Sequence, residues 1–301
     1  MLTRRMILIA AMLLAPASAV LAQEKLPVVA SFSIIADMVE NVGGDRVAVR
    51  SLVGPNGDAH VYSPSPADAK VVADAKVIVT NGLGFEGWIG RLMKSSKSKA
   101  VNIVASKGVK PRKMAGAHGH SHGHGHDDGD PHAWQSVANA KLYVANIRDG
   151  LIAADPAGKA VYDANAAAYL GKLDALDRQV REAVDKIPAE RRKVIVTHDA
   201  FGYFEDAYGL DFIAPQGVST NSEASARDVA RIIQQIKKQK IPAVFLENIS
   251  DPRLLKRIAD ETGAKLGGTL YSDALTDEKG DAPTYIDLIR HNITTLSAAL
   301  I

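Results

Sequence analysis

The chain has 301 residues, of which 47% are hydrophobic and 23% charged, and its formal net charge is +2. This length and composition indicate a globular protein with a buried core, arranged as one large domain or two smaller ones. The balanced charge gives no sign of nucleic-acid binding. Because the sequence contains no cysteine, disulfides and thiolate metal sites are excluded.

The first 22 residues have the features of a secretory signal peptide. Arg4 and Arg5 precede an apolar run, and VLA before Gln23 fits the small-x-small cleavage rule. The alternative is an uncleaved membrane anchor, but the apolar run is short for a span and contains a proline. We therefore expect cleavage after Ala22 and a mature protein in the periplasm. We expect no lipid anchor, since there is no cysteine to acylate.

Short apolar runs alternate with helical segments along most of the mature chain. The runs with strand character are 26–31, 47–54, 75–82 and 100–104, then 193–198, 210–215, 243–247 and 264–270. This alternation predicts parallel βα sheets. The expected fold class is α/β, with two βα lobes that each contain a parallel four-stranded sheet.

The longest periodic segment extends from about Lys159 to Ile187. Its apolar residues recur at spacings of three or four, which predicts an amphipathic helix that ends at Pro188. Such a helix would be roughly 43 Å long. We therefore place the N-terminal lobe at 23–157, the linking long helix at 158–188 and the C-terminal lobe at 189–301.

A histidine-rich loop is expected at residues 116–130. Five of the nine histidines alternate there with glycine or serine: His118, His120, His122, His124 and His126. Glycine at alternate positions costs too much conformational entropy for this run to form a rigid site unaided. We expect an auxiliary segment that captures or transfers zinc, assisted by Asp127, Asp128 and Asp130. The alternative is a spacer with incidental metal affinity.

Three other histidines and one aspartate follow predicted strands: His60, His132, His198 and Asp273. In open βα sheets, ligands bind beyond the carboxyl ends of the strands. Three imidazoles and one carboxylate suit tetrahedral zinc, whereas manganese prefers more oxygen ligands. The sequence therefore predicts a zinc site made of these four residues. The alternative for each histidine is a hydrogen bond to the backbone at a strand end, and His291 is expected to be structural or at the surface.

Other side chains near the strand ends could support the ligands. Metal-bound histidines usually donate their second ring nitrogen to a carboxylate or carbonyl. Three carboxylates are candidates for this role: Asp199, Glu223 and Glu247. Trp134 either shields the site or belongs to the core.

Four motifs around the predicted ligands resemble those of the cluster A-I metal-binding proteins of bacterial ABC importers. They are GDAHVYSPSPAD, DPHAW, THDAFGYF and YSDAL, in the family's order, and the resemblance covers essentially the whole mature chain. It implies two βα lobes joined by one rigid helix, with the metal held between the lobes. It also implies a binding protein that is not an enzyme and whose partner is a membrane ABC permease.

The third ligand divides this family, because manganese importers tend to carry glutamate there and zinc importers carry histidine. His198 therefore implies a periplasmic protein that binds Zn²⁺ with high affinity. Similarity to the AztC-type subgroup adds a periplasmic metallochaperone as a candidate partner, and we expect a monomer. The alternatives are a manganese-binding protein of the same family and a zinc-dependent hydrolase. The hydrolase is disfavoured because Asp273 fills the fourth ligand position and there is no HExxH helix.

Overall fold

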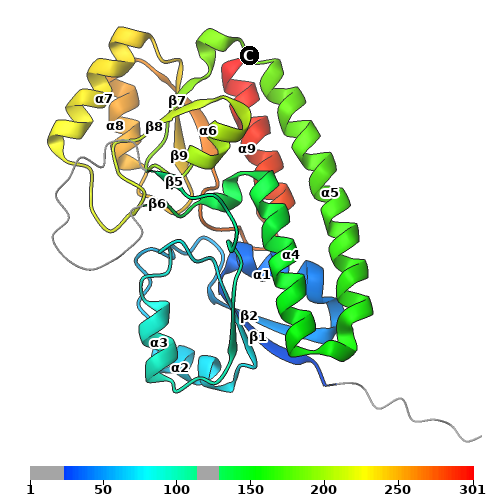
Figure 1. Ribbon diagram of the computed structural model, residues 1–301. Helices are drawn as coiled ribbons and strands as arrows, with labels where there is room; N and C mark the ends of the chain where they lie inside the picture. Colours follow the sequence, from blue (N-terminus) through cyan, green and yellow to red (C-terminus); the bar gives the residue numbers. More distant parts are fainter. Residues whose placement is uncertain (1–23, 114–128) are drawn as a thin grey trace, which may run out of the picture.

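A computed structural model describes residues 24–113 and 129–301 (Figure 1). It contains two lobes, each built on a parallel four-stranded sheet, which confirms the predicted α/β class. The expected signal peptide and the five histidines of the histidine-rich loop lie outside the described residues. Within the described ranges, no helix has the length and apolar character needed to cross a membrane.

The two sheets have related strand orders. The N-terminal sheet has the order β2-β1-β3-β4 and comprises β1 (Leu26–Phe32), β2 (Val47–Val53), β3 (Val77–Thr80) and β4 (Val101–Val104). The C-terminal sheet has the order β10-β9-β7-β8 and comprises β7 (Lys193–Ile195), β8 (Asp211–Ile213), β9 (Ala243–Glu247) and β10 (Lys265–Leu270). All neighbouring strands in both sheets are parallel, so the carboxyl ends of each sheet lie along one edge.

Helices pack around both sheets. In the N-terminal lobe they are α1 (Ser33–Gly43), α2 (Pro66–Asp74), α3 (Ile89–Ser95) and α4 (Val137–Ala154). In the C-terminal lobe they are α6 (Gly202–Tyr208), α7 (Ala226–Gln239), α8 (Arg253–Thr262) and α9 (Tyr285–Leu300). Ser65 begins α2 with a capping box, in which its hydroxyl and the Asp68 carboxylate accept from each other's backbone N–H.

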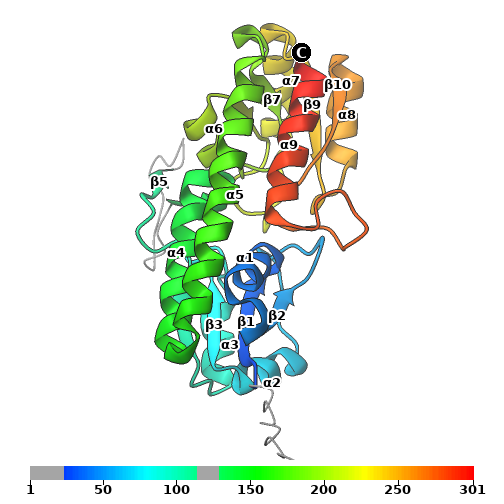
Figure 2. The ribbon, with the colours of Figure 1, turned by 90° about the vertical axis from the view of Figure 1, so that its right-hand side faces the viewer.

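The long helix α5 (Lys159–Asp185) extends along both lobes (Figures 1 and 2). It contacts α1 and α4 on one lobe and α6 and α9 on the other. Its buried face consists of Tyr162, Ala166, Tyr169, Leu173, Leu176, Val180 and Val184, at the predicted spacing. One hydrophobic cluster is continuous from β1 through α5 to α9, so the two lobes share a core. A shared core opposes a wide hinge motion between the lobes.

Buried polar contacts add to this connection. The backbone N–H of Tyr285, in α9, donates to Asp37 of α1 at 3.1 Å, and the Tyr285 hydroxyl donates to the Trp134 carbonyl at 2.6 Å. Burial raises the pKa of Asp37 to about 6. Trp134 is fully buried and belongs to the core.

A small antiparallel ribbon was not predicted. It pairs β5 (Arg112–Lys113) with β6 (Gly129–Asp130), one at each end of the segment 114–128. The backbone N–H of Arg112 donates to the Tyr203 hydroxyl at 2.9 Å, which fixes the ribbon to α6 of the C-terminal lobe. Strands of two residues carry too little periodicity to be recognised in a sequence.

Candidate metal centre

Four side chains predicted as ligands converge between the lobes. His60 follows β2, His132 follows β6, His198 follows β7 and Asp273 follows β10. One ligand atom from each lies within 4.8 Å of all the others. The loops of His60, His198 and Asp273 lie beyond the carboxyl ends of parallel strands, where parallel sheets present ligand-binding groups, whereas His132 follows a strand of the antiparallel ribbon.

The distances among the four side chains suit a metal ion. His60 Nε2 lies 3.2 Å from His132 Nε2 and 3.2 Å from Asp273 Oδ2. His198 Nε2 lies 3.1 Å from Asp273 Oδ2, and His132 Nε2 lies 3.5 Å from Asp273 Oδ1. A tetrahedral zinc ion with bonds of about 2.0–2.1 Å separates its ligand atoms by about 3.3 Å. The four separations given, 3.1–3.5 Å, are therefore close to the spacing that such an ion requires.

Burial differs among the four side chains. His132, His198 and Asp273 are inaccessible to solvent, whereas the His60 side chain is 4% exposed. The edge of the His60 ring packs on Phe85, with ring centroids 4.6 Å apart. His60 is thus the ligand on the solvent side of the site.

Two carboxylates orient two of the histidines. Asp130 Oδ1 lies 2.8 Å from His132 Nδ1 and also accepts from the His132 backbone N–H. Glu247 Oε2 lies 2.6 Å from His198 Nδ1, and Glu247 Oε1 accepts from the His198 backbone N–H. A proton on Nδ1, facing the carboxylate, leaves the Nε2 lone pair free for a metal.

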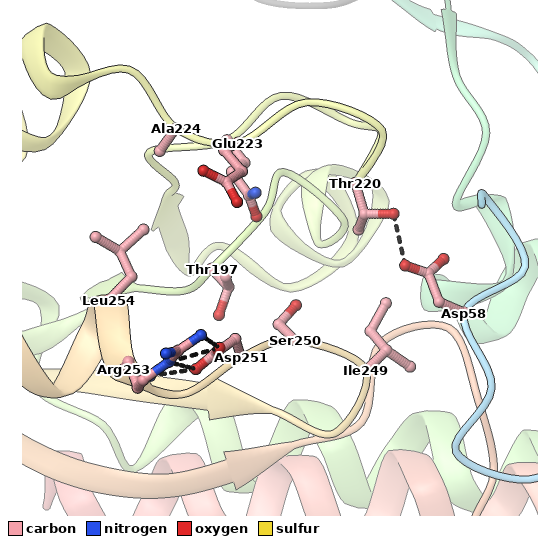
Figure 3. A pocket seen from close by; sticks show the side chains of 11 residues that line it. Asp58, Thr197, Thr220, Glu223, Ala224, Ile249, Ser250, Asp251, Arg253 and Leu254 are labelled. Carbon is pink, nitrogen blue, oxygen red and sulfur yellow. Dashed lines mark hydrogen bonds and ion pairs between the residues drawn. The ribbon is translucent and has the colours of Figure 1, made fainter.

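The third histidine, His60, is held by a carboxylate through its backbone N–H. The His60 backbone N–H donates to Asp58 Oδ1 at 2.9 Å, and Thr220 of the C-terminal lobe donates to Asp58 Oδ2 at 2.6 Å (Figure 3). Asp58 therefore connects the His60 loop to the opposite lobe. The loop that carries Asp273 belongs to the C-terminal lobe and is connected to the N-terminal lobe, because the Ser272 carbonyl accepts from the Trp134 indole at 2.9 Å.

The carboxylates also control the charge of the histidines. Burial lowers the pKa of His60. Burial alone would also lower the pKa of His132, but the Asp273 charge and the hydrogen bond that the ring donates to Asp130 outweigh it and raise that pKa to about 9. Burial is likewise outweighed at His198, where Glu247 and Asp273 raise the pKa well above its ordinary value. Without metal, His132 and His198 are therefore protonated at neutral pH, and a bound cation must displace those protons.

The predicted supporting residues have different outcomes. Glu247 lies against His198 as described, but Asp199 makes no described hydrogen bond to a ligand. Glu223 lines a neighbouring cavity of about 380 Å³ together with Asp58 and Thr197 (Figure 3). The role of Asp130 was not predicted, because this residue follows directly on the histidine-rich run and was expected to assist the loop. Its signal is the spacing Asp-x-His, which occurs both at 58–60 and at 130–132.

His291 lies outside the site, as expected. His291 Nε2 lies 3.0 Å from the Thr269 carbonyl oxygen, which is a structural contact. Phe201 and Phe204 are buried and pack with Phe212.

Two parallel βα lobes, one helix along both, and a buried cluster of histidines and a carboxylate between the lobes are typical of the metal-binding solute-binding proteins of ABC transporters. Residues 28–299 match the sequence model of the family described as zinc-uptake complex component A, periplasmic (ZnuA). The chain belongs to this family. Its members are substrate-binding proteins of ABC transporters and not enzymes, which removes the hydrolase alternative.

The relatives are named for different metals. The manganese-binding lipoprotein MntA of Halalkalibacterium halodurans is 35% identical over 277 residues, covering 92% of this chain and 89% of that protein. The iron-binding protein YfeA of Yersinia pestis is 35% identical over 274 residues, covering 91% and 86%. The solved structure of the periplasmic zinc-binding protein TroA from Treponema pallidum has a TM-score of 0.85 and 32% identity, covering 92% and 99%.

Proposed function

We propose that this chain binds Zn²⁺ with high affinity through His60, His132, His198 and Asp273 and delivers it to an ABC permease. The observation that carries the proposal is the arrangement of three imidazole Nε2 atoms and one carboxylate at about tetrahedral spacing. Neutral imidazoles favour zinc over manganese, which prefers sites richer in oxygen. Four protein ligands would also leave no open position on the ion, as in closed zinc sites.

The proposal extends to the parts of the chain around the site. Residues 1–22 would be a cleaved signal peptide that sends the protein to the periplasm. Residues 23–157 and 189–301 would form the lobes, joined by 158–188. The five histidines of the loop 116–130 would gather zinc near the main site. We include a periplasmic metallochaperone as a loading partner and expect the protein to act as a monomer.

Manganese is the alternative cargo, because the relative from Halalkalibacterium halodurans is named for it. The deciding experiment uses the mature protein without residues 116–128, a deletion that keeps Gly129 of β6, loaded with zinc and manganese together and then dialysed. We expect one zinc per chain by elemental analysis. His198→Ala should lose it, and His291→Ala, a histidine outside the site, should retain it. Retained manganese would change the cargo. No retained metal in a folded protein would make the loop the main site.

A second variant tests the choice of donor. His198→Glu replaces one imidazole by a carboxylate, so the site would hold two histidines and two carboxylates. Because oxygen donors suit manganese better than imidazole does, this variant should lose much of its preference for zinc in direct competition. An unchanged preference would show that the third ligand does not set the selectivity.

Metal release would require only a local change. The continuous core and α5 hold the lobes together, so a loop movement that removes one ligand is the simpler route. His60 is the outermost ligand, and its loop is connected to the other lobe through Asp58 and Thr220. A permease that binds the form with this connection broken would shift the protein towards release.

A further inference from the structure

The ribbon β5–β6 places one arginine beside the metal centre. Arg112 pairs with Asp130 across the ribbon, and its backbone N–H donates to the Tyr203 hydroxyl. Its guanidinium reaches α6, where Nε donates to Asp206 at 3.1 Å and Nη2 lies 3.7 Å from Glu205. Arg112 therefore holds the ribbon against the C-terminal lobe by both backbone and side chain.

The same guanidinium faces Asp130. Arg112 Nη1 lies 3.9 Å from Asp130 Oδ2. Asp130 is fully buried, and its Oδ1 is the oxygen that contacts His132. Its Oδ2 has no hydrogen-bond partner among the described residues. A buried carboxylate oxygen without a partner is costly, so the nearby guanidinium charge is what stabilises this orientation.

Gly202 provides the space for this pair. A Cβ at Gly202 would lie 2.3 Å from Arg112 Nη1 and 2.7 Å from Asp130 Oδ2. Both distances are far below van der Waals contact, so any side chain at this position would displace the arginine, the aspartate or both. The first residue of α6 is thus fitted to the pair that supports His132.

We propose that Arg112 is a positioning residue of the metal site, which acts through Asp130 to keep His132 oriented for the metal and thereby slows metal release. The inference rests on the proposed function, because it concerns the same site. Arg112 itself contacts none of the four ligand side chains among the described interactions. Its effect passes along the chain Arg112, Asp130, His132.

Two physical effects of removing Arg112 have opposite signs. Loss of a positive charge would strengthen the attraction for a cation. Loss of the orienting contact would weaken binding, and removal of groups that orient metal ligands typically costs 10- to 100-fold in affinity. Weaker metal binding after removal of Arg112 would therefore indicate positioning, and stronger binding would indicate a simple charge effect.

The experiment measures zinc dissociation into excess chelator, together with the visible spectrum of the Co²⁺-loaded protein, which reports ligand geometry. Arg112→Gln should release zinc about tenfold faster, at the lower end of that range. Arg112→Lys keeps the charge but not the planar fork, so it should rescue part of the loss. Gly202→Ala changes no charge and should act in the same direction as Arg112→Gln. Each variant that releases zinc faster should also have an altered Co²⁺ spectrum.

Arg46→Gln is the matched control. The Arg46 side chain is 17% exposed, as Arg112 is, and it pairs with Asp155 at 2.7 Å. It precedes β2, at the amino end of the sheet and away from the ligands. This variant should release zinc at the wild-type rate. Thermal unfolding of every variant separates a loss of stability from a change in the site.

A double-mutant cycle with Asp130→Asn tests the route. If Arg112 acts through Asp130, then Arg112→Gln should add nothing to the faster release of Asp130→Asn. Additive effects, or slower or unchanged release from Arg112→Gln alone, would overturn the inference. Failure of the proposed function has a different signature, because the wild-type protein would then retain no zinc or His198→Ala would retain it.

Discussion

Replacing Glu247 by glutamine should weaken zinc binding without disturbing the fold. The two oxygens of Glu247 serve different donors: Oε1 accepts from the backbone N–H of Thr197 at 2.7 Å, and Oε2 lies 2.6 Å from His198 Nδ1. Glutamine has only one oxygen. If that oxygen keeps the backbone contacts, its NH₂ group faces Nδ1 and favours the tautomer with the proton on Nε2. That proton would occupy the metal-binding atom.

The expected loss follows from this contact. Changing a group that orients a metal-bound histidine typically costs 10- to 100-fold in affinity, or about 1.4–2.8 kcal/mol. Glu247 is 4% exposed, and although burial would raise its pKa, the charge of His198 lowers it, so the carboxylate stays ionised. The assay is competition for zinc with a coloured chelator of known affinity at neutral pH.

Glu86→Gln is the control for neutralising a buried carboxylate. Glu86 is 6% exposed and accepts from the Ser31 hydroxyl, and burial raises its pKa. Glu86 makes no described contact with the four ligand side chains, so zinc affinity should be unchanged. Wild-type affinity in Glu247→Gln, with an unchanged circular dichroism spectrum, would refute the argument that this carboxylate sets the His198 tautomer.

Zinc binding at neutral pH should release protons, because the pKa of His132 in the metal-free protein is about 9 and the bound ring must be neutral. Calorimetry in buffers of different ionisation enthalpy measures this release, and identical heats would contradict it. The same raised pKa stabilises the metal-free fold below pH 6.5, and this contribution should disappear as the pH rises through 9. Asp37 also has a raised pKa, about 6, so its contribution is present below pH 3.8 and disappears as the pH rises through 6. Between pH 3.8 and 6, the free energy of unfolding of Asp37→Asn relative to wild type should therefore rise by up to about 3 kcal/mol. Urea unfolding measures both free energies, and the same difference between the two proteins at both ends of this window would exclude the rise. Thr220→Val removes the hydrogen bond to Asp58 and should speed zinc release by about tenfold or less. Thr294→Val, which loses only an exposed bond within α9, should not change the rate; equal rates in both variants would show that the connection between the lobes does not limit release.

The fold was predictable because most of its strands are short apolar runs separated by turn residues. All eight strands of the two sheets overlap the predicted runs, and α5 lies where the spacing of apolar residues placed it. The ribbon β5–β6 was not predictable. Its position depends on contacts with α6, such as the bond from Arg112 to Tyr203, which pair residues far apart in the chain.

The ligands of the site were predictable because they come after the ends of predicted strands. The rule that ligands bind beyond these ends placed His60, His132, His198 and Asp273 together, and the structure brings them within 4.8 Å of one another. The supporting carboxylates were harder to identify, because an acidic residue near a strand end is common. The part played by Arg112 requires the space above Gly202, which no local sequence pattern reports.

The charges of the site explain how it can be formed before the metal arrives. Asp130, Glu247 and Asp273 are buried, and buried carboxylates without opposite charges would destabilise the fold. The raised pKa values of His132 and His198 supply those opposite charges as protons. His60 differs, because burial lowers its pKa and its ring is neutral at neutral pH. The outermost ligand is therefore a neutral imidazole, in which one of the two ring nitrogens has a free lone pair. An entering cation can bind His60 first and then exchange for the two protons inside, so that binding replaces one set of positive charges by another in a site whose shape is already set.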